Sequence, residues 1–311
     1  MTRFRAYQLG SAGSSFSYFN GTSFTLIEGR FNDYNKISIC NELRACSRNS
    51  IDCLHITSWD DDHCSSNELT ELLKFLTPTS IECPKYPPTT SEGQRSLDVI
   101  TGYLAQNRLT RQGRIVNSVF VCTLPSALAF DNTNVVFDAS HDQSANPNDQ
   151  STIKLFRSEG FSVLSLGDVE SCDIANQICD VEIFQNEVDI LILAHHGADN
   201  GFTTNEFLKA IRPSLAICSS NYDNEYEHPR PEIRSLLWNH DVPLMTTKTG
   251  DVIIESNNDG NFRAHNLIAN STLISGSEPF KSKRQQHKEQ IFTSSLRNLL
   301  SAEPALNRKW I

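Results

Sequence analysis

The chain has 311 residues with 38% apolar side chains and a formal net charge of −10 at pH 7. This length can bury one large core or two modest ones, so a folded enzyme is feasible, and the acidic balance argues against a general electrostatic grip on nucleic acid, in which each phosphate contact needs a lysine or arginine. No apolar run approaches the roughly 20 residues that cross a bilayer and the amino terminus lacks the apolar stretch of a secretory signal, so we expect a cytoplasmic protein with no membrane partner.

Segments typical of β-strands recur through the first half of the chain, separated by Gly-Ser and Asn-Asp clusters. They cover residues 4–9, 23–28, 37–39 and 51–57. A helix is predicted over 66–76, because four of its leucines share one face and Ser66 can cap its start. A second helix is predicted over 91–105 by similar apolar spacing.

The strand pattern resumes in the second half of the chain. Strands are predicted over 118–123, 135–138, 152–156, 162–166, 190–193, 215–218 and 251–255. Helices are expected between them, notably over 205–211 and over 231–238, where Pro231 can take the first position because its missing N–H costs nothing there. Two strand-rich halves with interleaved helices predict an α/β fold, a four-layer αββα sandwich whose strand-end loops carry the chemistry.

The C-terminal part of the chain has a different pattern. We predict a main domain over 1–260 and a C-terminal extension over 261–311. The extension contains a basic run over 281–288, followed by apolar residues at helical spacing: Ile291, Phe292, Leu296, Leu299 and Leu300. Both a solvated terminal helix and a contact with a protein or nucleic acid would account for this pattern.

An apolar strand runs directly into a cluster of charged side chains within residues 54–63. Three carboxylates, those of Asp60, Asp61 and Asp62, precede the imidazole of His63. Adjacent like charges repel and raise each other's pKa values, and a bound cation is the usual remedy. The alternative is a solvated acidic turn that caps the following helix, where Asp and Ser are common.

Two further strands end in groups that bind metals. Asp168 follows one apolar strand, and His195 and His196 follow another. Carboxylate and imidazole groups on rigid strand ends suit a hard or borderline divalent ion, because the strands fix the ligand positions in advance. Taken alone, a Gly-Asp is usually a turn and a His-His-Gly is more often a pair of core histidines, so the prediction of a metal depends on the order and strand context of these motifs.

Taken in order, these motifs resemble the metallo-β-lactamase superfamily and, within it, the soluble domain of ComEC-type competence proteins. That group has His-x-Asp-x-Asp-His, an Asn with a Ser nearby, a Gly-Asp after a strand, His-His-Gly, and Asn-x-Tyr-x-His-Pro. The matching residues here are Asp60, Asp62 and His63; Asn148 and Ser151; Asp168; His195 and His196; and Asn224, Tyr226, His228 and Pro229. The resemblance extends over roughly residues 4–255.

Two positions depart from the pattern of that group. Ser58 stands where the first His of the metal motif is usual, and Glu28-Gly29-Arg30 replaces Asp-Gly-Gly. A neutral hydroxyl is a poor substitute for imidazole as a ligand, which weakens one of two metal sites. His141, in the long loop before Asn148, is a candidate replacement.

The resemblance implies a metal-dependent hydrolase, a phosphodiesterase or nuclease that uses a metal-activated hydroxide and one or two Zn or Mn ions. One ion would be held by Asp62, His63, Asp168 and one of His195 and His196. The other would be held by Asp60, Asp168 and Asn148.

Asp62 and His228 are the expected catalytic residues, with His228 protonating the leaving group or binding phosphate, unless it is only a turn residue before Pro229. Nucleic acid or a nucleotide is the expected substrate, and the tail is a candidate contact for a protein partner. The alternative function is a catalytically degenerate binding or regulatory subunit of a larger assembly, for example in anti-phage defence.

Overall fold

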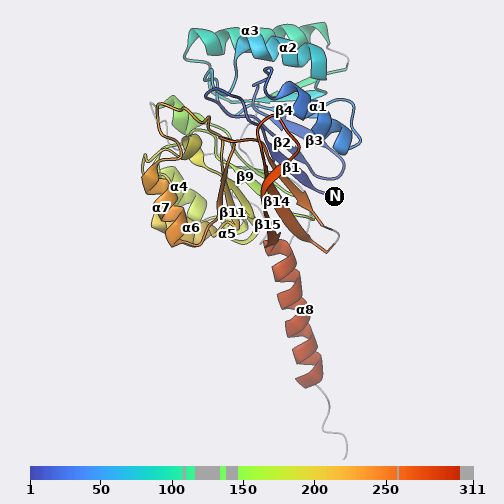
Figure 1. Cartoon of the computed structure of the whole chain (residues 1–311), viewed down its shortest axis with the longest axis vertical. Helices are drawn as coiled ribbons and strands as arrows, with labels where there is room; N and C mark the ends of the chain where they lie inside the picture. The colour runs from blue at the N-terminus through green and yellow to red at the C-terminus, as the bar shows by residue number, and fades with distance from the viewer. Residues whose placement is uncertain (108–109, 116–133, 138–145, 258, 302–311) are drawn as a thin grey trace, which may run out of the picture.

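The computed structural model describes residues 1–107, 110–115, 134–137, 146–257 and 259–301 (Figure 1). The strand predicted over 118–123 and the candidate ligand His141 lie outside the described residues.

The described strands form two mixed sheets. The first has the order β15 (Ile274–Lys281), β14 (Asn261–Leu267), β13 (Val252–Ser256), β1 (Arg3–Ala6), β2 (Phe16–Phe19), β3 (Phe24–Ile27), β4 (Cys53–His55), β5 (Ser80–Cys83) and β6 (Gln112–Ile115). The second has the order β12 (Leu244–Thr246), β11 (Leu215–Cys218), β10 (Ile190–Ile192), β9 (Val163–Ser165), β8 (Ile153–Phe156) and β7 (Val135–Phe137). Strands β3 to β6 are parallel, as are β9 to β12, so the ends of the parallel strands in each group meet at one edge.

Helices cover the outer face of each sheet (Figure 1). On the first sheet lie α1 (Lys36–Ala45), α2 (Ser66–Leu76) and α3 (Ser91–Gln106); on the second lie α4 (Cys172–Cys179), α5 (Glu182–Glu187), α6 (Asn205–Ile211) and α7 (Pro231–Asn239). Two short 3₁₀ turns, η1 (Pro147–Gln150) and η2 (Ala194–Gly197), complete the loops of the second half. The predicted α/β fold with four αββα layers is confirmed.

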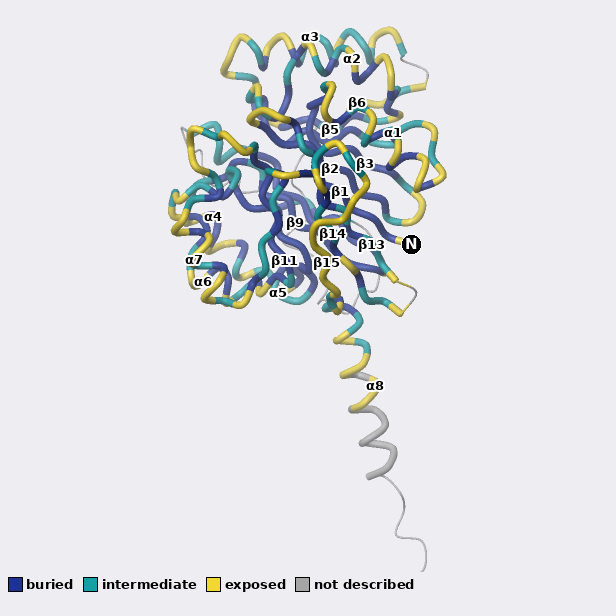
Figure 2. Tube along the Cα trace, viewed as in Figure 1, coloured by how far each residue is buried: buried dark blue, intermediate teal, exposed yellow. Residues whose placement is uncertain are grey.

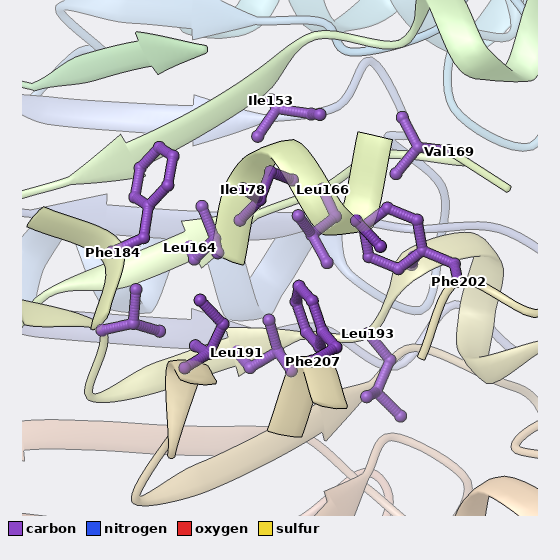
Figure 3. Packing of buried hydrophobic residues seen from close by; sticks show 14 of the residues in the cluster. Ile153, Leu164, Leu166, Val169, Ile178, Phe184, Leu191, Leu193, Phe202 and Phe207 are labelled. Atoms are coloured by element: carbon purple, nitrogen blue, oxygen red, sulfur yellow. The ribbon is translucent and has the colours of Figure 1, made fainter. Parts of the chain in front are cut away.

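Alternation along the strands explains the layers. In β10, Ile190 and Ile192 contribute to the core between the two sheets, whereas Leu191 points to the core under the helices (Figure 3). Successive strand residues face opposite sides, so a strand with apolar residues at every position can serve two cores at once. This is why the continuous apolar runs of the sequence correspond to buried central strands.

The helix predictions are confirmed in extent, with one error in capping. The N-cap of α2 is Ser65 rather than Ser66, and its side chain makes no capping hydrogen bond. The backbone N–H of Ser66 instead donates a hydrogen bond, 2.7 Å long, to the carboxylate of Glu92 in the neighbouring helix α3. The free N–H at this helix end is therefore satisfied by tertiary contact.

The strand predicted over 37–39 is wrong, because these residues belong to α1. Ile39, Glu42 and Leu43 are the buried residues of that helix. Their spacing of three and four residues is helical, and a three-residue run was too short to distinguish the two periods.

The C-terminal segment has two parts (Figures 1 and 2). Strands β14 and β15 pair with β13 and with each other in the first sheet, so the predicted limit at residue 260 falls between two hydrogen-bonded strands. The final helix, α8 (Lys283–Ser301), projects away from the body of the molecule and exposes Phe292. No helix among the described residues is both long and apolar enough to span a bilayer. Contact between this tail and a partner stays a prediction.

Candidate metal centre

Four carboxylate and imidazole side chains converge at the ends of the central strands. Asp62 and His63 lie in the loop after β4, Asp168 follows β9, and His196 follows β10. One potential ligand atom from each lies within 4.8 Å of the others. The closest approaches are 2.8 Å between His63 Nε2 and Asp168 Oδ2, and 3.1 Å between His196 Nε2 and Asp62 Oδ2. We refer to these four residues as the metal cluster.

Each imidazole of the metal cluster is oriented through its second nitrogen. His63 Nδ1 lies 3.2 Å from Glu28 Oε1, and His196 Nδ1 lies 3.0 Å from the backbone oxygen of Ser219. If Nδ1 carries the proton and donates to these oxygens, the lone pair of Nε2 faces the cluster in both rings. Such outer partners usually fix the tautomer of a metal-binding histidine.

Glu28 was interpreted from the sequence only as a departure from a motif. Its carboxylate accepts hydrogen bonds from the Thr57 hydroxyl at 2.6 Å and from the Thr57 backbone N–H at 3.1 Å, so it is held rigidly beneath His63. The signal that could have identified it is a single acidic residue at the end of β3, the strand next to β4.

Unsatisfied polar atoms show that these residues fit a cation. His63 Nε2 and Asp168 Oδ1 are buried and make no hydrogen bond to any residue that the structure describes, although Nε2 lies near the other oxygen of that carboxylate. Buried polar atoms without a partner are costly. A divalent ion coordinated by two imidazoles and two carboxylates would satisfy both atoms.

Electrostatics in the metal cluster favour positive charge. Burial alone would lower the pKa of His63, but the carboxylates of Asp168, Glu28 and Asp62 outweigh it and raise that pKa well above its ordinary value. Burial opposes ionisation of Asp168, yet the neighbouring imidazole of His63 lowers its pKa. The carboxylates therefore give the site a negative potential that favours a bound cation.

The backbone that presents His196 is strained. His195 and His196 have φ angles of 44° and 54°, in the left-handed region that residues with a Cβ seldom adopt. The turn is held by hydrogen bonds from the N–H of His195 to Gly167 O at 3.0 Å and from the N–H of Arg230 to Gly197 O at 3.0 Å. Strain of this kind is common where a side chain must take a functional orientation.

Three of the predicted ligands lie outside the metal cluster. Asp60 accepts a hydrogen bond from the Ser58 hydroxyl at 3.1 Å, and Ser58 also contacts the hydroxyl of Tyr86 at 3.1 Å. Asn148 and His195 both contact Glu170, at 3.0 Å and 2.6 Å. Glu170 was missed in the sequence, where only its position two residues after Asp168 could have indicated it. The choice left open between His195 and His196 is thus answered geometrically, because only His196 joins the metal cluster; the roles of all these residues as ligands stay predictions.

His228 lies beside the metal cluster at the wall of a cavity of about 220 Å³. Burial, together with the positive charges of His196, His195 and Arg230, lowers its pKa to about 4. The cavity is lined by Ala12, Gly13, Asp62, His195, His196, Ser219, Ser220, Asn221, Asn224, Tyr226 and His228. The structure therefore brings together the residues predicted to be catalytic, Asp62 and His228, around one hollow.

Comparisons with known proteins give distant similarities. No protein-family model matches the chain. A segment of 58 residues, 19% of the chain, is 36% identical to the competence protein ComA of Neisseria gonorrhoeae, of which it covers 8%. Among solved structures, a metallo hydrolase from Ignicoccus hospitalis has a TM-score of 0.47 and 14% identity over 82% of this chain and 100% of its own.

A metal-dependent hydrolase of the β-lactamase superfamily is similar to the same degree. It has a TM-score of 0.48 and 12% identity, covering 83% of this chain and 100% of its own. The fold is shown by the sheet order and the layers of the chain itself.

Proposed function

We propose that the protein is a metal-dependent hydrolase that cleaves phosphodiester bonds, as a phosphodiesterase or nuclease. The observation that carries the proposal is the convergence of Asp62, His63, Asp168 and His196 from three strand ends, with two of their atoms buried and without a hydrogen-bond partner in the described part of the chain. Carboxylate and imidazole at this spacing form a ligand set for Zn²⁺ or Mn²⁺.

A divalent ion bound at this site would supply Lewis acidity, which polarises a phosphoryl oxygen and makes water a nucleophile near neutral pH. The remaining work falls to residues of the chain. Glu28 and Ser219 orient the two imidazoles. His228 lines the cavity next to His196 and is suited to contact the substrate there.

The phosphodiester as substrate is supported by the resemblance of five ordered motifs and by the short similarity to a competence protein. The acidic surroundings argue for a substrate that needs few phosphate contacts. We infer one ion per chain, held by the metal cluster, because no other group of three or more His, Cys, Asp or Glu side chains among the described residues brings potential ligand atoms this close together.

Purified protein incubated with Mn²⁺ or Zn²⁺ and a panel of single-stranded DNA, duplex DNA, RNA and cyclic nucleotides tests the proposal. We expect cleavage of at least one substrate and its loss in His63→Ala and Asp168→Ala. The matched variant His195→Ala should keep its metal, measured by elemental analysis. A panel that remains intact, or cleavage that persists without His63, would contradict the assignment.

A second candidate function is a non-catalytic binding or regulatory module. Ser58 favours it, because this residue contacts Asp60 and Tyr86 where the resemblance predicts a metal-binding histidine. Elemental analysis separates the two functions. One ion per chain supports the hydrolase, and none after purification without chelators supports the module.

A further inference from the structure

Three aromatic rings lead from the metal cluster to the surface. The rings of His196 and His228 have centroids 6.1 Å apart and planes inclined by 9°. His228 is followed by Tyr226, at 5.6 Å and 27°. Ring pairs at these separations are offset rather than face to face, so each ring leaves part of its face uncovered. We refer to these three residues as the ring series.

The outer member of the ring series is exposed. Tyr226 has 59% of its surface accessible and belongs to none of the three buried cores, yet it lines the same cavity as Asp62 and His196. Its loop is fastened at both ends, because the amide of Asn224 donates to Asn221 O at 3.0 Å and to His228 O at 3.1 Å. The ring is thus held in place without contributing to the core.

The charges around the cavity restrict what can bind. The described residues that line it include no lysine or arginine, and the loop carries three acidic residues, Asp223, Glu225 and Glu227. A duplex gains its affinity from many phosphate contacts with cations. Single strands can instead gain affinity by stacking unpaired bases on aromatic side chains.

The size of the cavity is consistent with a small part of a strand. Its volume of about 220 Å³ is below the roughly 300–1,000 Å³ of pockets that enclose drug-sized ligands. The ring series extends from the metal cluster to Tyr226. This arrangement suits one phosphodiester at the metal cluster and one neighbouring base on the ring of Tyr226.

We propose that Tyr226 is the stacking platform for the base next to the scissile phosphodiester, and that the substrate is a single strand rather than a duplex. This rests on the proposed phosphodiesterase function. Stacking on one aromatic residue changes affinity by roughly 5- to 150-fold per base, and it does so without selecting among bases.

Binding of a labelled ten-nucleotide single strand with cleavage-resistant phosphorothioate linkages, measured by fluorescence anisotropy with Mn²⁺, tests the proposal. Tyr226→Leu should raise the Kd by roughly 5- to 150-fold, and Tyr226→Phe, which keeps the ring, should stay within about twofold of the unmodified chain. Tyr222→Leu is the matched control, because Tyr222 is exposed on the same loop but does not line the cavity. Circular dichroism checks that each variant is folded.

A second arm replaces the bases of the strand by abasic sites. The Kd of the unmodified chain should rise by the same factor with this probe, whereas the Kd of Tyr226→Leu should be the same for both probes. The proposal would be overturned if Tyr226→Leu and the unmodified chain had equal affinities, or if Tyr226→Phe lost as much affinity as Tyr226→Leu. Tighter binding of the matching duplex, or no binding of the single strand at all, would also overturn it.

The outcomes also separate this proposal from the proposed function. If the unmodified chain cleaves no phosphodiester but Tyr226→Leu binds the single strand more weakly, stacking is supported and hydrolysis is not. If the chain cleaves a single strand and Tyr226→Leu binds and cleaves it equally well, hydrolysis is supported and stacking is overturned.

Discussion

At the scale of single residues, Glu28 and Ser219 orient the two imidazoles of the metal cluster. Each takes one nitrogen of an imidazole, which leaves the other nitrogen of His63 or His196 facing the cluster. Neither residue belongs to the metal cluster itself. Their importance follows from the geometry of histidine, whose two nitrogens have opposite roles in the neutral ring.

Glu28→Gln should weaken metal binding by about 10- to 100-fold, because a neutral amide holds the His63 tautomer less firmly than a carboxylate. Titration against a fluorescent chelator measures this change. Glu170→Gln is the matched control, since Glu170 contacts Asn148 and His195 outside the metal cluster. Equal loss in both variants would mean that Glu170 also serves the bound ion.

The number of protein ligands predicts the preferred metal. Four donors complete the tetrahedral shell that is usual for structural zinc, whereas Mn²⁺ accepts further oxygen ligands. We therefore expect faster hydrolysis with Mn²⁺ than with Zn²⁺ at equal occupancy, measured on the best substrate of the panel. A higher rate with Zn²⁺ would indicate that one of the four residues leaves the ion during turnover.

At the scale of elements, the loop between β1 and β2 closes over the metal cluster. The N–H of Ser14 donates to Asp62 O at 2.9 Å, and the Ser219 hydroxyl donates to Gly13 O at 2.8 Å. Gly13 has a φ of +128°, and a Cβ there would collide with the backbone oxygen of Asp62 and the guanidinium of Arg30. A glycine is required by both the conformation and the close approach.

Gly13→Ala should lower the free energy of unfolding by about 1–3 kcal/mol and weaken metal binding, because the backbone of Asp62 must shift. Urea denaturation and metal titration measure the two effects. Gly102→Ala is the control: it lies inside α3 with nothing within 4 Å of the new Cβ, and should stabilise by up to about 1 kcal/mol. Unchanged stability in Gly13→Ala would show that the loop can move aside.

At the scale of the whole molecule, a buried polar network joins the two sheets. His55 of β4 and Lys154 of β8 both contact the carboxylate of Glu82 from β5. Burial lowers the pKa of His55, and Lys154 adds to this effect. Burial alone would raise the pKa of Glu82, but its contacts with His55 and Lys154 outweigh burial and lower it.

Both shifts make stability depend on pH in the same direction. The unfolded chain binds a proton at His55 below about pH 6.5 and at Glu82 below about pH 4.5, whereas the lowered pKa values of the folded chain delay both protonations. The free energy of unfolding should therefore fall as the pH is lowered from 7 to 4. Urea denaturation across this range measures the slope. Glu82→Gln should be less stable at pH 7 with a shallower slope below pH 4.5, and the exposed Glu278→Gln should behave as the unmodified chain. A slope unchanged by Glu82→Gln would assign the acid sensitivity to other groups.

Local pattern was sufficient to predict the fold class and its layers, but it missed the short strands β2, β5, β6 and β12. The apolar runs of β9, β10 and β11 and the leucine spacing of α2 depend on the period of each element, which is a property of neighbouring residues. The error at 37–39 arose where the run was too short to define a period. The resemblance of the ordered motifs likewise predicted that Asp62, His63 and Asp168 would meet one of the two histidines after β10, although β4 lies in the first sheet and β9 and β10 lie in the second.

The sequence by itself therefore determined the layers and the strand ends that carry the polar side chains. Only the tertiary structure decided which of them form the metal cluster. The left-handed turn at His195 and His196 directs one ring inward and the other toward Glu170, and Asp60 is held by Ser58. Glu28 gains its place from contacts with Thr57 and His63, which are distant from it in sequence. Side-chain direction at a loop depends on backbone angles and on packing across the two sheets, and neither is encoded in the local period of the chain.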